Sequence, residues 1–149
     1  MKIVICGAGL VGSAIASHLS EEHNDVTVID ASAENIQRIT DHYDVHGVVG
    51  VASHPDRLAE AGVRDAELLI AVTESDEVNM VACQISHSIF NTPVKIARIP
   101  ITLISIQPMR HYMVTAICPS IISFRQKRKY RRQSATNCAC RGHLVAKIC

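Results

Sequence analysis

Three glycines spaced as G-x-G-x-x-G stand near the start of the chain. The loop that contains them reads Gly7, Ala8, Gly9, Leu10, Val11 and Gly12. The apolar run KIVIC precedes the loop and apolar residues at helical spacing follow it, which predicts a strand, a glycine loop and a helix. In that order Gly7 permits a tight turn, Gly9 lets the backbone approach a pyrophosphate, and Gly12 lets the helix pack closely. The N–H groups at the start of the helix can then bind phosphate oxygens.

An acidic residue, Asp30, ends the next apolar run, DVTVID, 18 residues beyond Gly12. A carboxylate at this position can accept hydrogen bonds from an adenosine ribose, and its charge repels a 2′-phosphate. The pattern therefore predicts a site for NAD+ or NADH rather than for NADP(H). A glycine turn without a ligand is the alternative, but the complete order of strand, loop, helix, second strand and acid favours the nucleotide site.

The elements that must position these residues alternate between strand and helix as far as Arg98. The apolar runs DVHGVVG, AELLIAVT and VKIARI predict three further strands. Strands that alternate with helices at this spacing form a parallel sheet joined by right-handed crossovers. We therefore expect an α/β fold, a Rossmann-like doubly wound parallel sheet of about five strands.

Three helices are expected between these later strands. Ser32 can cap the first, which carries Ile36 and Ile39. The segment SHPDRLAEAG supplies the second with a cap, a proline at the first helical position and Gly62 as terminator. The apolar face of the third is expected to consist of Val78, Val81, Ala82, Ile85 and Ile89.

Ligands on a doubly wound sheet bind outside the C-terminal ends of the strands. Besides the glycine loop and Asp30, these ends are expected to carry four candidate residues. They are Ser53, Thr73, Glu74 and Arg98. The guanidinium of Arg98 could reach a diphosphate, although a solvated strand end or a salt bridge to Glu74 or Asp76 is the alternative.

No catalytic set or metal site accompanies this pattern. Five histidines are scattered over expected helices and loops without the spacing of a nucleophile pair or a metal site, namely His18, His42, His46, His54 and His87. Cys6 and Cys83 are interpreted as small core residues. A dehydrogenase would need a substrate domain, for which 149 residues leave no room. We therefore expect a binding protein and not an enzyme, with an NAD-dependent oxidoreductase fragment as the alternative.

Residues 1–98 resemble the N-terminal NAD-binding domain of the TrkA-type potassium-uptake regulatory proteins of the RCK/KTN group. The block DAELLIAVTESDEVNMVAC is more specific to that family than the glycine motif. The resemblance implies a cytoplasmic subunit at the inner face of the membrane, homo-oligomeric in intact members. Such a subunit binds NAD+ or NADH and thereby biases opening of a Trk-type potassium channel subunit. The implied nucleotide contacts are Gly7 to Val11, Asp30, Thr73, Glu74 and Arg98.

The chain changes character after Arg98. Residues 1–98 carry six basic and 14 acidic residues, a charge of −8, whereas residues 99–149 carry nine basic and no acidic residue, a charge of +9. We therefore divide the chain into a nucleotide-binding domain, 1–98, and an aberrant tail, 99–149. The start of the chain, KIVICGAG, does not read as a signal peptide, which favours a reducing cytoplasm without disulfides.

Three functional interpretations of the tail are open. A long apolar segment, 101–124, could cross a membrane, but Arg110 near its centre costs about 2.5 to 3.5 kcal/mol. The basic run from Arg125 to Arg132 could bind the phosphates of a nucleic acid, which would make the chain a nucleic-acid- or membrane-binding protein. Cysteine and histidine near the end lack the paired spacing of a zinc site. These residues are Cys138, Cys140, His143 and Cys149.

A fourth interpretation needs only the genetic code. The possible codons for Ala116–Gln126 can be read in a frame that begins one base earlier. In that frame they can encode HLPIDHIISPE, a string typical of the family. The segments Cys140–Leu144 and Ile106–Met109 permit family-like strings in the same shifted frame. This favours a one-base slip near Arg98 to Ile101. We then expect a tail without function of its own, poorly ordered and unable to add a strand to the sheet, and no nucleic-acid partner.

Overall fold

The computed structural model describes residues 1–99 and, for the backbone alone, 121–124. The elements in chain order are β1 (Lys2–Cys6), α1 (Leu10–Glu21), β2 (Asp25–Asp30), α2 (Ala33–His42), β3 (His46–Val49), α3 (Pro55–Glu60), the 3-10 turn η1 (Val63–Asp65), β4 (Leu68–Ala71), α4 (Asp76–Ser88), β5 (Val94–Arg98) and β6 (Ile121–Phe124). The expected alternation of strands and helices is confirmed over the first 98 residues.

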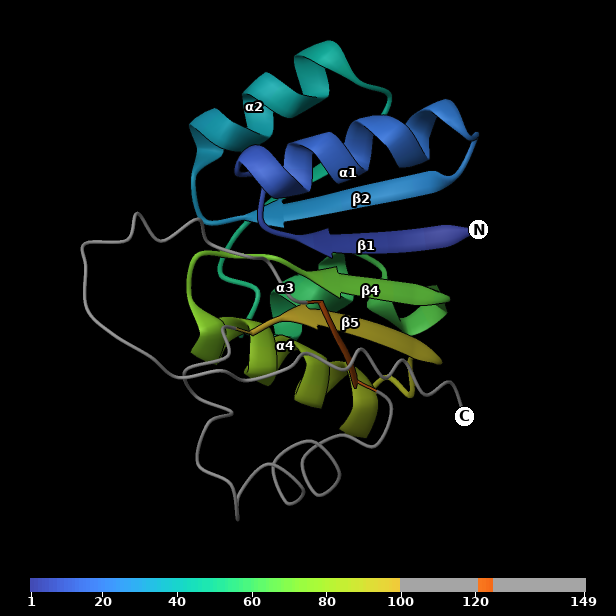
Figure 1. Ribbon diagram of the computed structural model, residues 1–149, viewed down its shortest axis with the longest axis vertical. Helices are drawn as coiled ribbons and strands as arrows, with labels where there is room; N and C mark the ends of the chain where they lie inside the picture. Colours follow the sequence, from blue (N-terminus) through green and yellow to red (C-terminus); the bar gives the residue numbers. More distant parts are fainter. Residues whose placement is uncertain (100–120, 125–149) are drawn as a thin grey trace, which may run out of the picture.

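All strands run parallel in one sheet of order β3-β2-β1-β4-β5-β6. The chain moves outward from β1 to β3, then returns to the other side of β1 with β4. This reversal is the topological switch point at which doubly wound sheets bind dinucleotides. Figure 1 shows β1, β2, β4 and β5 pointing the same way, so their C-terminal ends share one edge of the sheet. The Rossmann-like fold is confirmed.

The sixth strand corrects the expectation that the tail adds no strand. Residues Ile121–Phe124 pair in parallel with β5, in the register Lys95↔Ile121 to Arg98↔Phe124. A short run with two isoleucines suits a strand, and β5 would otherwise leave its backbone groups unpaired along one side. The other interpretations of the tail concern segments of which the structure describes at most residues 121–124.

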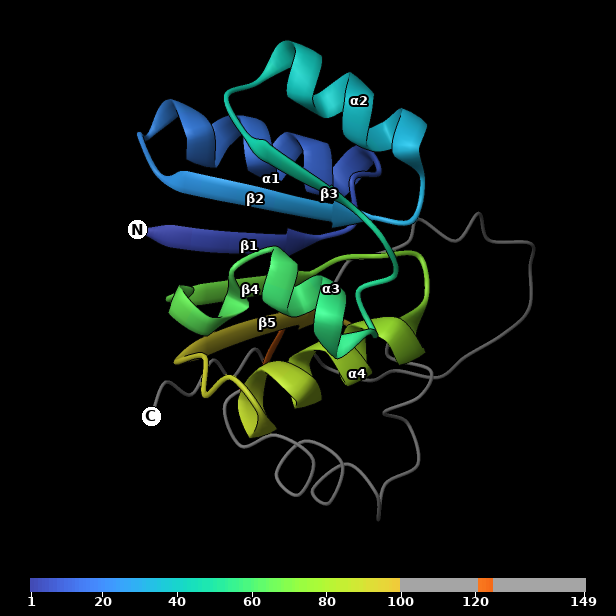
Figure 2. The same ribbon diagram turned by 180° about the vertical axis from the view of Figure 1, so that it is seen from behind.

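Helices cover both faces of the sheet. Helices α1 and α2 pack over β1, β2 and β3 on one face, and α3 and α4 pack over the other (Figure 1). Seen from behind, α3 lies in front of the sheet (Figure 2). Successive residues of β1 serve opposite faces, because Ile3 and Ile5 belong to the α1/α2 core while Val4 and Cys6 belong to the α3/α4 core. A strand buried on both faces reads as the continuous apolar run seen in the sequence.

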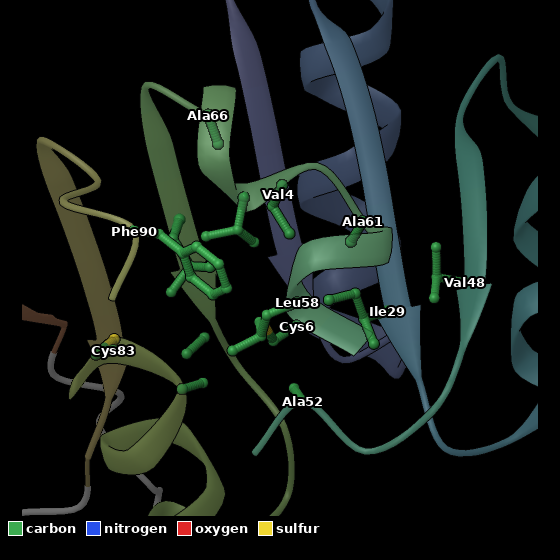
Figure 3. Packing of buried hydrophobic residues seen from close by; sticks show 14 of the residues in the cluster. Val4, Cys6, Ile29, Val48, Ala52, Leu58, Ala61, Ala66, Cys83 and Phe90 are labelled. Atoms are coloured by element: carbon green, nitrogen blue, oxygen red, sulfur yellow. The ribbon is translucent and has the colours of Figure 1, made fainter. Parts of the chain in front are cut away.

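The α3/α4 core is built around Leu58 and Phe90 (Figure 3). Leu58, from the short helix α3, is fully buried against residues of the central strands, among them Val4 and Ile29. Burial of one such side chain contributes about 1.5 to 3 kcal/mol. This contact fixes α3, and with it the turn after β3, against the sheet.

The helix ends follow the sequence signals with one exception. Ser32 caps α2, because its Oγ accepts a hydrogen bond from the backbone N–H of Asn35. Pro55 begins α3, and Gly62 follows α3 with a φ of 76°, a left-handed conformation suited to glycine. The residue before Pro55, however, is His54, which makes no side-chain cap bond. Pro55 itself removes one of the unpaired N–H groups at this end of the helix, because proline has no backbone N–H.

The buried face of α4 differs from the expected one. Its buried residues are Asn79, Ala82, Cys83 and Ser86. Val81 and Ile89 are 42% and 53% exposed, so their assignment to the core face is wrong. Val78 and Ile85 do pack against the core, from its border. The small side chains at the centre of the face allow α4 to approach β4 and β5 closely, and the larger apolar residues are displaced to the sides.

Candidate functional site at the C-terminal edge of the sheet

The glycine loop leaves β1 in a conformation that favours glycine. Gly7 has a φ of 109°, and its N–H donates to the carbonyl oxygen of Ile29 at 2.7 Å. A Cβ at Gly7 would lie 3.0 Å from both the backbone nitrogen and the Cα of Thr73. A Cβ at Gly12 would collide with the carbonyl oxygen of Gly7. The loop thus packs closely against the start of α1 and the segment after β4. This close packing is possible because Gly7 and Gly12 have no side chain.

The start of α1 presents backbone N–H groups at the same edge. Gly9 is its N-cap and makes no side-chain cap bond, and the first turn carries no acidic residue. A Cβ at Gly9 would meet nothing within 4 Å, so the backbone at this point is open to a ligand. The next residue, Leu10, is 90% exposed. Uncapped N–H groups at a helix N-terminus are suited to phosphate oxygens.

The carboxylate of Asp30 is hydrogen-bonded to the backbone of the glycine loop. Its Oδ2 accepts a hydrogen bond from the backbone N–H of Ala8 at 2.6 Å, and its Oδ1 accepts one from the N–H of Ser32 at 2.8 Å. The side chain of Asn35 approaches the same Oδ1 at 3.5 Å. Asp30 therefore fixes the loop relative to α2, and the remaining lone pairs of its carboxylate can accept from a ribose hydroxyl.

The ends of β4 and β5 are joined through Asn79 of α4. Its Oδ1 accepts from the N–H of Thr73 at 2.9 Å and from the Thr73 hydroxyl at 2.7 Å. Its Nδ2 donates to the carbonyl oxygens of Thr73 at 3.2 Å and Arg98 at 3.0 Å. Nη2 of Arg98 donates to the Thr73 carbonyl at 2.9 Å. We call Thr73, Asn79 and Arg98 the Asn79 cluster.

The sequence reasoning missed Asn79. It is fully buried, and it lies at helical spacing from Ala82, Cys83 and Ser86, the residues that form the buried face of α4. A lone amide among small residues at that spacing must satisfy its polar atoms inside the protein. This signal could have identified Asn79 as a residue with several partners.

The other candidates lie at the same edge but are less closely joined. Arg98 is bonded to Thr73, and the ion pairs found among residues 1–99 do not include it. Glu74 is exposed in the loop between β4 and α4. Ser53 is half-buried in the turn after β3, which the strand order places beyond β2 as seen from the glycine loop.

Cys6 and Cys83 are buried core residues, as expected, and take no part in the site. Burial raises the pKa of the Cys6 thiol far above its ordinary value, and the neighbouring Cys83 raises it further. Cys6 is thereby kept neutral inside the core.

Over the described part of the chain, no group of three or more His, Cys, Asp and Glu side chains could hold a metal ion. Nor does any helix there have the length and apolar character needed to span a membrane.

Comparison with protein families matches residues 3–101 to the TrkA-N domain. The Trk system potassium uptake protein TrkA of Azorhizobium caulinodans is 63% identical over 99 residues, which are 66% of this chain and 22% of that protein. The proteins of the same name from Halomonas elongata and Vibrio alginolyticus are 50% identical over 102 residues and 52% identical over 99 residues, with 68% and 66% of this chain covered and 22% of each relative. The chain thus spans about a fifth of the length of these relatives.

Solved structures share the fold at low sequence identity. The TrkA-N domain of the inner membrane protein ybaL from Escherichia coli superposes with a TM-score of 0.67 at 17% identity, over 82% of this chain and 86% of that one. The GsuK channel bound to NAD gives 0.62 at 16% identity, over 81% of this chain and 21% of that one. These similarities concern the arrangement of the backbone.

Proposed function

Because this chain belongs to the TrkA-N domain family, we propose that it binds NAD+ or NADH and acts as a cytoplasmic, non-enzymatic regulatory part of a Trk-type potassium uptake system. The nucleotide lies along the C-terminal edge of the sheet. The protein residues that contact it are the glycine loop from Gly7 to Gly12, Asp30, Thr73 and Arg98. Ser53 and Glu74 lie at the margins of the site.

The observation that carries the nucleotide proposal is the position of Asp30 beside the glycine loop. The hydrogen bond from the Ala8 N–H to Asp30 places a negative charge beside the uncapped start of α1. Phosphate oxygens suit the helix start, and ribose hydroxyls suit the carboxylate. A mononucleotide with both groups fits this half of the site, and a 2′-phosphate is repelled from it.

The channel partner is inferred from the relatives. Proteins named for Trk potassium uptake are 63%, 50% and 52% identical to this chain over about 100 residues. The likeness to the GsuK channel is one of fold. We propose that the nucleotide state of this domain is passed to a membrane channel subunit of the Trk type, and that the intact protein is a homo-oligomer.

We further propose that the family domain ends near residue 98, although β6 adds a short strand from the tail to the same sheet, and that the tail arises from a one-base slip. High identity to the relatives extends over 99 to 102 residues, and the family match ends at residue 101. The abrupt change from −8 to +9 in charge occurs at the same place. A displaced reading frame accounts for both.

Calorimetric titration of the full chain with NADH, NADPH and AMP tests the nucleotide proposal. We expect NADH to bind more tightly than NADPH, and AMP to bind to the Asp30 half of the site. Equal or tighter binding of NADPH would contradict the role of Asp30. If none of the three nucleotides binds, the proposed function is wrong.

A further inference from the structure

The side chain of Asn79 uses its full hydrogen-bonding capacity inside the protein. A carboxamide offers two N–H donors and two acceptor lone pairs, and all four are engaged, by Thr73 and by the carbonyl of Arg98. The donors and acceptors of the partners also fix which atom is nitrogen, because the Thr73 N–H needs an acceptor and the Arg98 carbonyl needs a donor. Asn79 is therefore held in one orientation, at 0% exposure.

This arrangement determines what the Thr73 hydroxyl can offer to a ligand. A hydroxyl has one hydrogen, and the acceptors nearest to it are Asn79 Oδ1 at 2.7 Å and the Ser75 carbonyl at 3.0 Å. The hydrogen is thus directed into the protein. To a ligand the Thr73 oxygen then offers only its lone pairs, which accept from an O–H or N–H group and repel a phosphate oxygen.

Arg98 supplies the complementary chemistry beside it. One of its five N–H donors is used by the Thr73 carbonyl, and Asn79 holds its backbone through the Arg98 carbonyl. The cluster therefore pairs a cationic donor, suited to a phosphate, with a neutral acceptor, suited to a hydroxyl. These are the two chemical groups of a second mononucleotide.

We propose that Asn79 is a positioning residue for the half of the site that binds the second, nicotinamide mononucleotide, and that Thr73 accepts a hydrogen bond from a hydroxyl or amide of that half. The inference rests on the proposed nucleotide function. In a sheet of order 3-2-1-4-5-6 each half binds one mononucleotide. The β1–β2 half, with Asp30, takes the adenosine side. That leaves the other side for the Asn79 cluster, which lies on the loop after β4, on α4 and at the end of β5.

The test compares AMP with NADH on the full chain, since only NADH reaches both halves. Thr73→Val keeps the side-chain shape and both backbone bonds to Asn79 but removes the hydroxyl. We expect NADH binding to weaken about tenfold, the usual effect of one neutral hydrogen bond, while AMP binding is unchanged. Thr92→Val is the matched control, because Thr92 is a buried threonine before β5, bonded to Val63, and this change should move neither affinity.

Asn79→Asp tests the positioning role directly. It keeps the shape of the side chain, but its two oxygens cannot donate to the carbonyls of Thr73 and Arg98. We expect the ratio of NADH to AMP affinity to fall, whereas a merely structural defect lowers both affinities together. Should this variant not fold, amide exchange of wild-type Thr73 replaces it, and we expect exchange to slow with NADH and not with AMP.

The outcomes separate this inference from the proposed function. If Thr73→Val leaves NADH binding intact, or weakens NADH and AMP alike, the assignment of the Asn79 cluster is wrong while the Asp30 half of the site stands. The same conclusion follows if Thr73 exchange responds equally to both nucleotides. If the wild-type chain binds neither AMP nor NADH, the proposed function fails and this inference fails with it.

Discussion

Asp30 Oδ2 lies 2.6 Å from the backbone nitrogen of Ala8, so the acid at the end of β2 is a structural part of the glycine loop as well as a candidate ligand for ribose. Its other oxygen accepts from the N–H of Ser32 at the start of α2. A substitution at Asp30 therefore affects two things together, the charge seen by a nucleotide and the hold on the loop. An isosteric change to asparagine keeps one of the two backbone hydrogen bonds, so it separates the two effects better than truncation to alanine, which loses both.

We expect Asp30→Asn to weaken NADH binding by about 1.5 to 3 kcal/mol, the contribution of a hydrogen bond to a charged group. The preference for NADH over NADPH should fall further, because the charge that repels the 2′-phosphate is lost. Titration calorimetry with both nucleotides measures this. Asp25→Asn, at the exposed first residue of the same strand, is the control and should leave both affinities unchanged. An unaltered preference in Asp30→Asn would show that the acid does not face the ribose.

Two glycine substitutions should have opposite consequences. Gly9→Ala adds a methyl group where nothing lies within 4 Å, so the protein should fold normally but bind NADH poorly. Gly12→Ala drives a Cβ into the Gly7 carbonyl oxygen, which should lower the free energy of unfolding by about 1 to 3 kcal/mol. Urea denaturation and NADH titration of both variants distinguish these effects. Normal NADH binding by Gly9→Ala would contradict a close approach of the loop to the phosphates.

Stability should decrease at alkaline pH through Cys6. Burial raises the pKa of this thiol, so in the folded protein it stays neutral at pH values where the unfolded chain ionises. The stabilisation that comes from keeping Cys6 neutral is complete below the ordinary thiol pKa of about 8.5. Above that pH the free energy of unfolding falls by about 1.4 kcal/mol per pH unit. Urea denaturation between about pH 8 and 10 measures this fall, and it should be less steep for Cys6→Ala than for wild type. Identical slopes would mean that Cys6 ionises freely in the folded state.

The proposed slip in reading frame is tested at the level of the gene. Sequencing across codons 95 to 105 should reveal one base too many or too few compared with a frame that continues the family pattern. Restoring that frame should extend the similarity to the TrkA proteins beyond the present 99 to 102 residues. If the restored frame encodes no such similarity, residues 99–149 belong to the protein as written.

The sequence was sufficient to predict the parts of the fold that depend on local pattern. Apolar runs located the first five strands, and the glycine spacing with Asp30 predicted which strand ends meet, because parallel strands share one C-terminal edge. Gly62 was correctly predicted to follow a helix, since its left-handed conformation favours glycine.

Features that depend on packing between elements were not predicted. The buried face of α4 is set by how closely small residues approach the sheet, so a pattern of large apolar residues misplaced Val81 and Ile89. The partners of Asn79 are Thr73, just after β4, and Arg98, at the end of β5, which lie 6 and 19 residues away in sequence. Lys95 appeared only as a charge in the sequence, yet it is buried, and its ammonium donates to the Thr92 carbonyl at 2.6 Å.

The alternation of β1 between two cores bears on how the domain unfolds. Ile3 and Ile5 belong to one core and Val4 and Cys6 to the other, while the strand is paired on one side with β2 and on the other with β4. Neither core can lose its packing without releasing a strand that the other requires. The two halves of the sheet, on either side of the switch point between β1 and β4, should therefore unfold as a single cooperative unit. The amides of β1 should exchange with solvent only when the whole domain opens, which makes them reporters of global stability.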